Sequence, residues 1–172
     1  IGIRAQNADN LTINLVISTN RITGIEFTTS GQDLTLTNNN LSNNTTALFI
    51  GSATDGGDAN SVPVVATGNT FTGSATGINL NVMTGQLVAT SGTGIIVADT
   101  DGLKTTTNRA LYFSQVTNTT VDGLDLTYSG TGRAGSGIYA DGTNNNLTIQ
   151  NVTATNRTTG LRLGDGGQDL TV

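Results

Sequence analysis

One stretch of this chain occurs twice, near opposite ends of the sequence. Residues 10–36 read NLTINLVISTNRITGIEFTTSGQDLTL and residues 146–172 read NLTIQNVTATNRTTGLRLGDGGQDLTV, with 15 of 27 positions identical and no gap. With one gap the match extends backwards, so that residues 2–36 correspond to residues 137–172 at an offset of about 136 residues. A repeat of fixed period indicates a unit that stacks on copies of itself.

A shorter rhythm runs inside this period. A small residue followed by alternating apolar residues recurs as GIEF, ALFI, GINL, GIIV, ALYF, GIYA and GLRL, at intervals of 23, 30, 17, 16, 27 and 23 residues. We take the two short intervals as one coil of 33 residues. Alternation such as Leu11-Thr12-Ile13 is typical of a strand with threonine outward and aliphatic residues inward. No segment has the 3.6-residue periodicity of a long amphipathic helix. The pattern therefore predicts an all-β solenoid of about six coils of 23 to 33 residues.

The composition agrees with many short strands joined by tight corners. Threonine supplies 33 residues, glycine 23 and asparagine 20; threonine favours strands, whereas asparagine and glycine favour turns and left-handed backbone. We expect the asparagine clusters at residues 38–40 and 144–146 to lie between strands, in left-handed conformation or in stacked amide ladders. The residues expected to fill the bore are Leu11, Ile13, Ile25, Phe27, Leu34, Leu36, Ile78 and Leu80.

Two phrases carry a resemblance to a known family. NLTIQNVTATNRTTGLRL and DLTLTNNNLSNNTTALFI resemble the repeats of right-handed parallel β-helices, the three-sheet coil of pectate-lyase-like proteins and of large repetitive bacterial surface proteins and adhesins. The resemblance covers essentially the whole chain and implies a single β-solenoid segment over residues 1–172. A stack of this size would be about 30 Å tall, with unpaired strand edges at both ends. Neither end of the sequence reads as a capping repeat, so we expect a slice of a longer array.

Charge and residue usage exclude several classes of function. The net charge is −5, and the seven Lys and Arg residues are scattered, which argues against nucleic-acid binding. No apolar run approaches the roughly 18 residues of a membrane span. Histidine and cysteine are absent, which removes Ser-His-Asp and Cys-His catalysis and typical zinc sites. A chain without cysteine and with a single lysine suits an extracellular or cell-surface location.

Carboxylate chemistry remains to be weighed. The stretch DTDGLK, residues 99–104, is similar to the NTDG motif of β-helical polygalacturonases, but the paired Asp, the Gly-His-Gly and the Arg-Ile-Lys of that family are missing. Asp99 and Asp101 on one strand would point the same way, so we expect a polar corner turn there. A lyase-like groove would need coil stacking to bring Asp122 and Asp125 beside Arg109 or Arg133. We predict no enzyme, with a polysaccharide lyase or glycoside hydrolase as the alternative.

Calcium binding without catalysis is a further hypothesis. The loop DGGDAN places Asp55, Asp58 and Asn60 within six residues, and such oxygen ligands suit a hard cation. Residues 164–172 loosely resemble the nonapeptide of calcium-binding repeat toxins, with departures at the second glycine and at the aliphatic eighth position. A plain surface turn is the first reading of both stretches, and Ca²⁺ binding is the alternative. We therefore predict no cofactor, with Ca²⁺ as the one candidate.

Two readings of the threonine-rich and asparagine-rich surface have simpler explanations. Outward pairs such as Thr35 and Thr37 would suit an ice-binding face, but the irregular coil lengths argue against one flat face. Asn-x-Ser/Thr triplets are expected by chance in a chain of this composition, so they give little support to glycosylation.

The sequence thus predicts a structural role. We expect a repeat of an extracellular fibre, sheath or adhesin stalk that assembles by end-to-end stacking with neighbouring copies. The alternative is a β-helix that binds or cleaves a polysaccharide such as a cell-surface glycan. That alternative would be favoured if Asp and Arg side chains and the tyrosines Tyr112, Tyr128 and Tyr139 converged on one sheet. A calcium-stabilised adhesive module is the third class.

Overall fold

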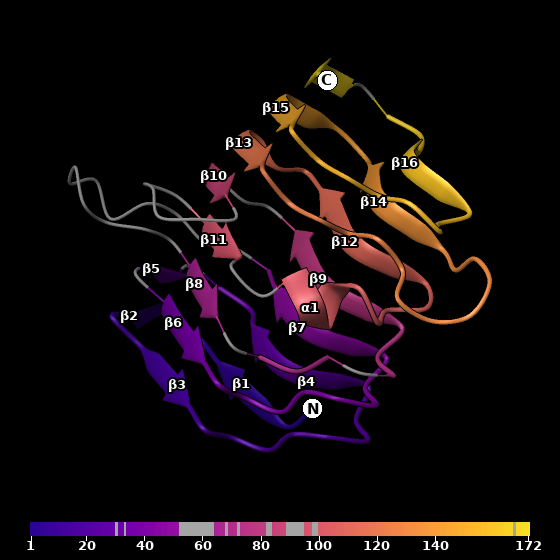
Figure 1. Cartoon of the computed structure of the whole chain (residues 1–172). Helices are drawn as coiled ribbons and strands as arrows, with labels where there is room; N and C mark the ends of the chain where they lie inside the picture. Colours follow the sequence, from indigo (N-terminus) through magenta and orange to yellow (C-terminus); the bar gives the residue numbers. More distant parts are fainter. Residues whose placement is uncertain are drawn as a thin grey trace.

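The structure is a computed structural model of the chain that describes residues 1–29, 31–32, 34–51, 64–67, 69–71, 73–81, 84–88, 95–97, 100–166 and 168–172. Every strand pair in these residues is parallel. The chain winds upward as a coil, with its two termini at opposite ends of the stack (Figure 1). Short strands that pair in parallel with the next pass of the same chain make a parallel β-solenoid, as predicted.

The first long sheet receives one strand from every pass of the chain. Its seven strands, in spatial order, are β1 (Ile3–Ala5), β4 (Thr23–Phe27), β7 (Thr46–Ile50), β9 (Thr76–Asn81), β12 (Arg109–Ser114), β14 (Ser136–Asp141) and β16 (Thr159–Leu163). Paired residues on neighbouring strands are 22 to 33 residues apart in sequence. The phrases GIEF, ALFI, GINL, ALYF, GIYA and GLRL all fall on these strands, so the predicted rhythm marks this sheet.

The second long sheet has one strand more. Its order is β3 (Thr12–Asn14), β6 (Leu34–Thr37), β8 (Val64–Thr67), β11 (Ile95–Val97), β10 (Thr84–Val88), β13 (Thr117–Asp122), β15 (Asn144–Gln150) and β17 (Gln168–Thr171). β11 lies between β8 and β10, so the phrase GIIV belongs to this sheet and not to the first. This insertion explains why the two short intervals in the sequence add up to one coil. A small separate sheet pairs β2 (Ala8–Asp9) with β5 (Gly31–Gln32).

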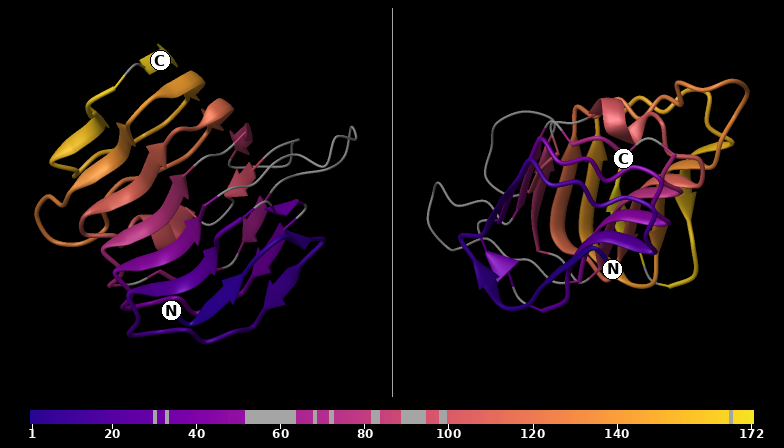
Figure 2. Two further views of the ribbon diagram at one scale, coloured as in Figure 1. Left: turned by 180° about the vertical axis from the view of Figure 1, so that it is seen from behind. Right: turned by 90° about the horizontal axis from the view of Figure 1, so that it is seen from below.

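The third side of the coil is held by isolated bridges. Ile17 pairs with Asn40, Asn40 with Thr70, and Asp125 with Thr153, all in parallel. Between these two sets the chain forms α1 (Thr100–Leu103), a single helical turn. Of the corner turn expected at residues 99–104, residues 100–103 are therefore helical, and Asp99 lies outside the described residues. Figure 2 shows the chain wrapping around one axis with the two long sheets on different sides.

The number of regular turns is about four rather than six. Four turns give one strand to each long sheet and are flanked on both sides, namely those of β4 and β6, β7 and β8, β12 and β13, and β14 and β15. The first and last turns are open on one side, and the turn that begins with β9 places both β10 and β11 in the second sheet. No helix in the described residues has the length and hydrophobicity needed to cross a bilayer.

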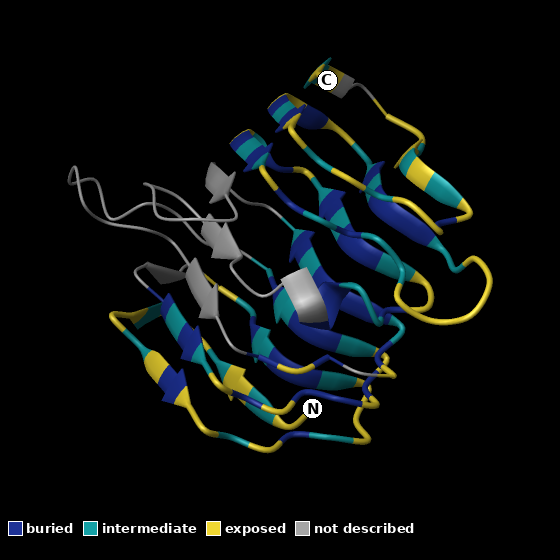
Figure 3. Cartoon of the chain, viewed as in Figure 1, coloured by how far each residue is buried: buried dark blue, intermediate teal, exposed yellow. Residues whose placement is uncertain are grey.

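Aliphatic residues stack in columns inside the coil. On the first sheet one column runs through Ile25, Leu48, Ile78, Leu111 and Ile138, which are in register and at most 1% exposed. Figure 3 shows buried and half-buried residues alternating along these strands, as a pleated strand requires. The predicted bore residues are all buried except Leu11, which is half-buried and packs against the core at the N-terminal end.

Asparagine takes left-handed backbone as predicted, but only the cluster at residues 38–40 lies between strands, whereas residues 144–146 belong to β15. It supplies nine of the eleven non-glycine residues with positive φ among the described residues, since asparagine tolerates this conformation best among ordinary side chains. Asn39 is buried and donates from its side-chain amide to Asn69 Oδ1 at 2.9 Å and to the Ile13 carbonyl at 3.0 Å. The interior amide ladder therefore joins successive turns at a corner of the coil.

Candidate functional site

The outward side of the first sheet carries a second column of side chains. Strand register places one residue from each strand in line, and we call this column the outer ladder: Arg4, Glu26, Phe49, Asn79, Tyr112, Tyr139 and Arg162. These residues alternate with the buried aliphatic positions, so their side chains lie on the opposite face of the sheet. Three of the seven are aromatic in a chain that is only 4% aromatic.

The upper half of the outer ladder, together with Arg109 on β12, forms a tyrosine–arginine cluster of Tyr112, Tyr139, Arg109 and Arg162. The rings of Tyr112 and Tyr139 meet edge-on, with centroids 5.5 Å apart and planes at 68°. The Arg109 guanidinium lies 4.5 Å from the Tyr112 ring centroid and 5.0 Å from that of Tyr139. Arg162 lies 4.8 Å from the same Tyr139 centroid. Cation–π attraction at these distances holds the four side chains as one surface.

A carboxylate completes this cluster. The Tyr112 hydroxyl donates to Asp141 Oδ2 at 3.3 Å. Partial burial, and then the negative charge of Asp141, raise the pKa of Tyr112 above its ordinary value. Tyr112 therefore stays protonated at neutral pH and remains a donor.

The lower end of the outer ladder is a plain ion pair. Arg4 contacts Glu26 Oε2 at 3.0 Å, and the Arg4 side chain is half exposed. An exposed pair of this kind contributes little to stability. The chemically distinctive part of the ladder is thus the tyrosine–arginine cluster, where flat apolar rings, guanidinium donors and one carboxylate face outward together. Such a combination suits a sugar chain, since rings pack on the apolar faces of sugars and guanidinium groups bind acidic substituents.

The carboxylates singled out in the sequence have partners of their own. Asp122 accepts hydrogen bonds from Asn151 at 2.8 Å and Gln150 at 3.0 Å, and these bonds lower its pKa. Asp125 pairs with Lys104 at 2.9 Å, and that contact lowers its pKa to about 2.

The arginines proposed for a lyase-like groove lie elsewhere. Arg109 stacks on the tyrosines of the first sheet, while Asp122 belongs to β13 on the second. Arg133 is exposed, and no ion pair joins it to either carboxylate in the part of the chain that the structure describes. The structure thus does not bring the groove's predicted residues together.

The predicted calcium ligands Asp55, Asp58 and Asn60 lie outside the described residues, as does Asp99. Of the second candidate segment, residues 168–171 form β17, the last strand of the second sheet. Among the described residues no group of three or more acidic side chains comes together. The calcium hypothesis stays a prediction.

One buried arginine was not anticipated from the sequence. Arg157 is 5% exposed and donates to the carbonyl oxygens of Leu126 at 2.7 Å, Thr106 at 2.6 Å and Leu103 at 2.8 Å. Burial lowers its pKa from the usual arginine range. Tyr128 lies beside this guanidinium, 5.5 Å from ring centroid to Cζ, and is therefore separate from the other two tyrosines. The available signal was the repeated TNR phrase, whose first copy carries the exposed Arg21.

Comparison with known protein families, with curated proteins and with solved structures finds no match to this chain. The assignment as a parallel β-solenoid therefore rests on the strand register described above. Because a solenoid supports many unrelated activities, function must be argued from these surfaces.

Proposed function

We propose that this chain is a structural repeat of an extracellular or cell-surface fibre, sheath or adhesin stalk. In this proposal the coils continue end to end, and neighbouring copies of the repeat are the partner. Backbone hydrogen bonds between turns supply stiffness, the aliphatic columns supply cohesion, and the threonine and asparagine exterior keeps the rod in solution. No catalytic step is part of the proposal.

One observation carries it. The two copies of the repeated sequence fold into the same element of the solenoid at opposite ends of the stack: β3, β4 and β6 in the first copy, and β15, β16 and β17 in the second. These strands of each copy belong to the same two long sheets, in the same order, and β5 of the first copy belongs to the small separate sheet. A period that returns the coil to its starting phase supports indefinite continuation.

The experiment is the mass of the native polypeptide that contains this segment, measured on a denaturing gel with peptide mapping. We expect a chain much heavier than the 17.5 kDa of this sequence, with peptides that recur in slightly varied form. A native chain of 17.5 kDa that stays monomeric at high concentration would overturn the structural role. A short chain that associates into filaments would support stacking between separate subunits.

The tyrosine–arginine cluster favours a second candidate function. Tyr112, Tyr139, Arg109, Arg162 and Asp141 converge on the first sheet, which is the arrangement a polysaccharide-binding β-helix would need. The two arginines add positive charge to one surface of a chain whose net charge is −5. We infer that the ligand in this case is an acidic glycan.

Affinity electrophoresis tests this second candidate by measuring how far a panel of neutral and acidic polysaccharides retards the protein. Arg162→Ala and Tyr139→Ala should each weaken retardation by an acidic polysaccharide. Arg133→Ala removes an equally exposed arginine outside the cluster and should leave retardation unchanged. Equal loss in Arg162→Ala and Arg133→Ala, with no loss in Tyr139→Ala, would indicate an effect of charge alone. No retardation by any polysaccharide would remove this function.

A further inference from the structure

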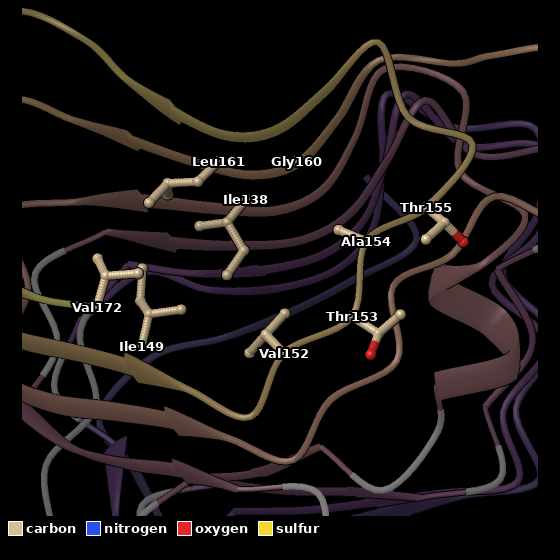
Figure 4. Close-up of a pocket in the computed structure, with 9 residues that line it drawn as sticks. All are labelled: Ile138, Ile149, Val152, Thr153, Ala154, Thr155, Gly160, Leu161 and Val172. Carbon is tan, nitrogen blue, oxygen red and sulfur yellow. The ribbon is translucent and has the colours of Figure 1, made fainter.

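The C-terminal end of the coil contains an open apolar pocket. Its volume is about 430 Å³, and its walls include Ile138, Ile149, Val152, Gly160 and Leu161. Figure 4 shows the side chains of Ile138, Ile149, Val152 and Leu161, which come from the last two turns of the coil, gathered round one space with Val172. The pocket is thus the open end of the bore. Its lining residues occupy the inward-facing positions that fill the bore in the other turns.

The internal repeat supplies a covered version of the same surface. Leu161, Leu163 and Val172 correspond to Ile25, Phe27 and Leu36 in the first copy. Ile25, Phe27 and Leu36 are at most 1% exposed, because another turn lies on them. Leu163 is 49% exposed and Val172 80%. The same sequence element is therefore closed at one end of the molecule and open at the other.

Residues 38–50 cover Ile25 and Phe27 in the first copy, and we call them the covering turn; Leu36 pairs instead with Ala66 on β8. Ile25 pairs with Leu48 and Phe27 with Ile50, on adjoining strands of the first sheet. The cover fits closely: a Cβ on Gly24 would lie 2.6 Å from the Ala47 carbonyl oxygen, inside contact distance. At the equivalent Gly160 the nearest atom to such a Cβ is 3.9 Å away, on Ala154. Gly160 in the pocket therefore leaves the space that a second covering turn would need.

The covering turn also matches the backbone of the repeat. Asn39 Oδ1 accepts from Val16 N at 2.9 Å, and Asn44 Oδ1 accepts from Arg21 N at 2.8 Å. The Asn44 amide donates to the Ser18 carbonyl at 2.8 Å. The equivalents of Val16, Arg21 and Ser18 are Val152, Arg157 and Ala154, and two of these line the pocket. A second covering turn would supply the same three hydrogen bonds there.

We propose that this pocket receives a turn with the sequence pattern of residues 38–50. The turn belongs to a further copy of the repeat that continues the coil on the same polypeptide. The inference rests on the proposed structural function and adds the identity and phase of what docks. A separate folded copy is a poor donor, because its own residues 38–50 are already packed on its residues 10–36. The occupant is thus a specific turn, with asparagines at two fixed positions and leucine and isoleucine in register.

The test extends the chain. Residues 37–81 are appended after Val172, which restores the order that follows Leu36 in the first copy. The matched control appends residues 123–167, a segment of equal length that follows β13 on the same second sheet but belongs to another phase of the repeat. We compare the original chain, the first extension and the control extension. The two measured quantities are the rate of amide exchange at Leu161 and Leu163 and the thermal unfolding midpoint.

We expect exchange at Leu161 and Leu163 to slow by an order of magnitude or more in the first extension. Its midpoint should rise, and the control should change neither property to that extent. Leu163→Ser should barely affect the original chain but lower the midpoint of the first extension clearly. Equal protection by both extensions, or protection by neither, overturns the inference.

Failure here is distinguishable from failure of the structural role. A heavy native polypeptide with recurring peptides would preserve the rod even if the appended turn did not close the pocket. Closure of the pocket in the extended chain would stand even if the native protein proved not to be a surface rod.

Discussion

The guanidinium of Arg157 donates a hydrogen bond of 2.6 Å to the carbonyl oxygen of Thr106, a residue 51 positions earlier in the chain. A second nitrogen of the same group reaches Leu103, the last residue of α1, at 2.8 Å. The charge is thus buried against carbonyl oxygens, which supply the negative ends of dipoles where a carboxylate would otherwise be expected. One side chain therefore joins the short helix to the turn above it.

Arg157→Ala is expected to lower the free energy of unfolding by about 3–5 kcal/mol, because three buried carbonyl groups lose their donor. Arg157→Lys should recover only part of this, since an ammonium group lacks the planar fork. The matched control is Arg21→Ala, at the equivalent and exposed position of the first copy, with an expected change within about 0.5 kcal/mol. Urea denaturation of the three variants measures these changes in the free energy of unfolding. Equal losses of stability in Arg157→Ala and Arg21→Ala would contradict the structural role of Arg157.

Gly24 and Gly160 offer a second matched pair. Gly24→Ala should destabilise the chain by about 1–3 kcal/mol, because the new methyl group would press on the Ala47 carbonyl and the Asn44 amide. Gly160→Ala makes only ordinary van der Waals contact with Ala154 and should stabilise by up to about 1 kcal/mol through the unfolded chain. Thermal unfolding at equal protein concentration distinguishes the two. A large loss at Gly160 would mean that the C-terminal end is already covered.

The interior amide ladder predicts the cost of removing Asn39. Asn39→Leu would leave Val16 N, the Ile13 carbonyl and Asn69 Oδ1 without this partner, at a cost of about 2–4 kcal/mol. Thr35→Val, on the outward side of the strand that leads into this corner, should change stability by less than about 0.5 kcal/mol. Chemical denaturation checks both variants. A neutral Asn39→Leu variant would show that the corner can repack without its amide.

The Lys104–Asp125 ion pair predicts an acid-dependent loss of stability. The pKa of Asp125 falls from 3.8 to about 2 on folding, so the folded state favours the ionised form. This contribution is fully present above pH 3.8 and is lost as pH falls towards 2. Because both side chains are partly exposed, the effect should stay below about 1 kcal/mol and shrink with salt.

Unfolding midpoints between pH 6 and pH 2 measure this pair. Asp125→Asn should flatten the dependence over the acid range, whereas Asp165→Asn, at an exposed turn, serves as the control. An unchanged slope in Asp125→Asn would show that the ion pair does not contribute.

Much of the fold could be predicted because its rules are local. Alternation along each strand decides which side chains face the bore, and this placed Ile25, Phe27, Ile78 and Leu80 correctly. Leu11 is the exception, since its burial depends on a turn beneath it and not on its own strand. The expected six coils became about four regular ones because the first and last turns are open on one side and the turn that begins with β9 places both β10 and β11 in the second sheet.

The sites depend on contacts between turns. Tyr112 and Tyr139 were candidates for a common surface, and they do share one, but Tyr128 lies beside Arg157. Asp122 and Asp125 were candidates to meet an arginine, and each has a different partner. A change of one residue in a coil's length moves a side chain to the other face of its strand or to another corner, so such meetings cannot be read from spacing alone.

By itself the sequence determined the repeat, its period and the inward or outward direction of side chains along each strand. These follow from the two-residue period of a strand and from the match between residues 10–36 and 146–172. Only the tertiary structure decided which residues stack on which: the outer ladder, the burial of Arg157 and the open pocket at the C-terminal end. The reason is that paired residues of the first sheet are 22 to 33 positions apart, and Arg157 is 51 positions from Thr106, in coils of unequal length. Their register is therefore fixed by packing between turns.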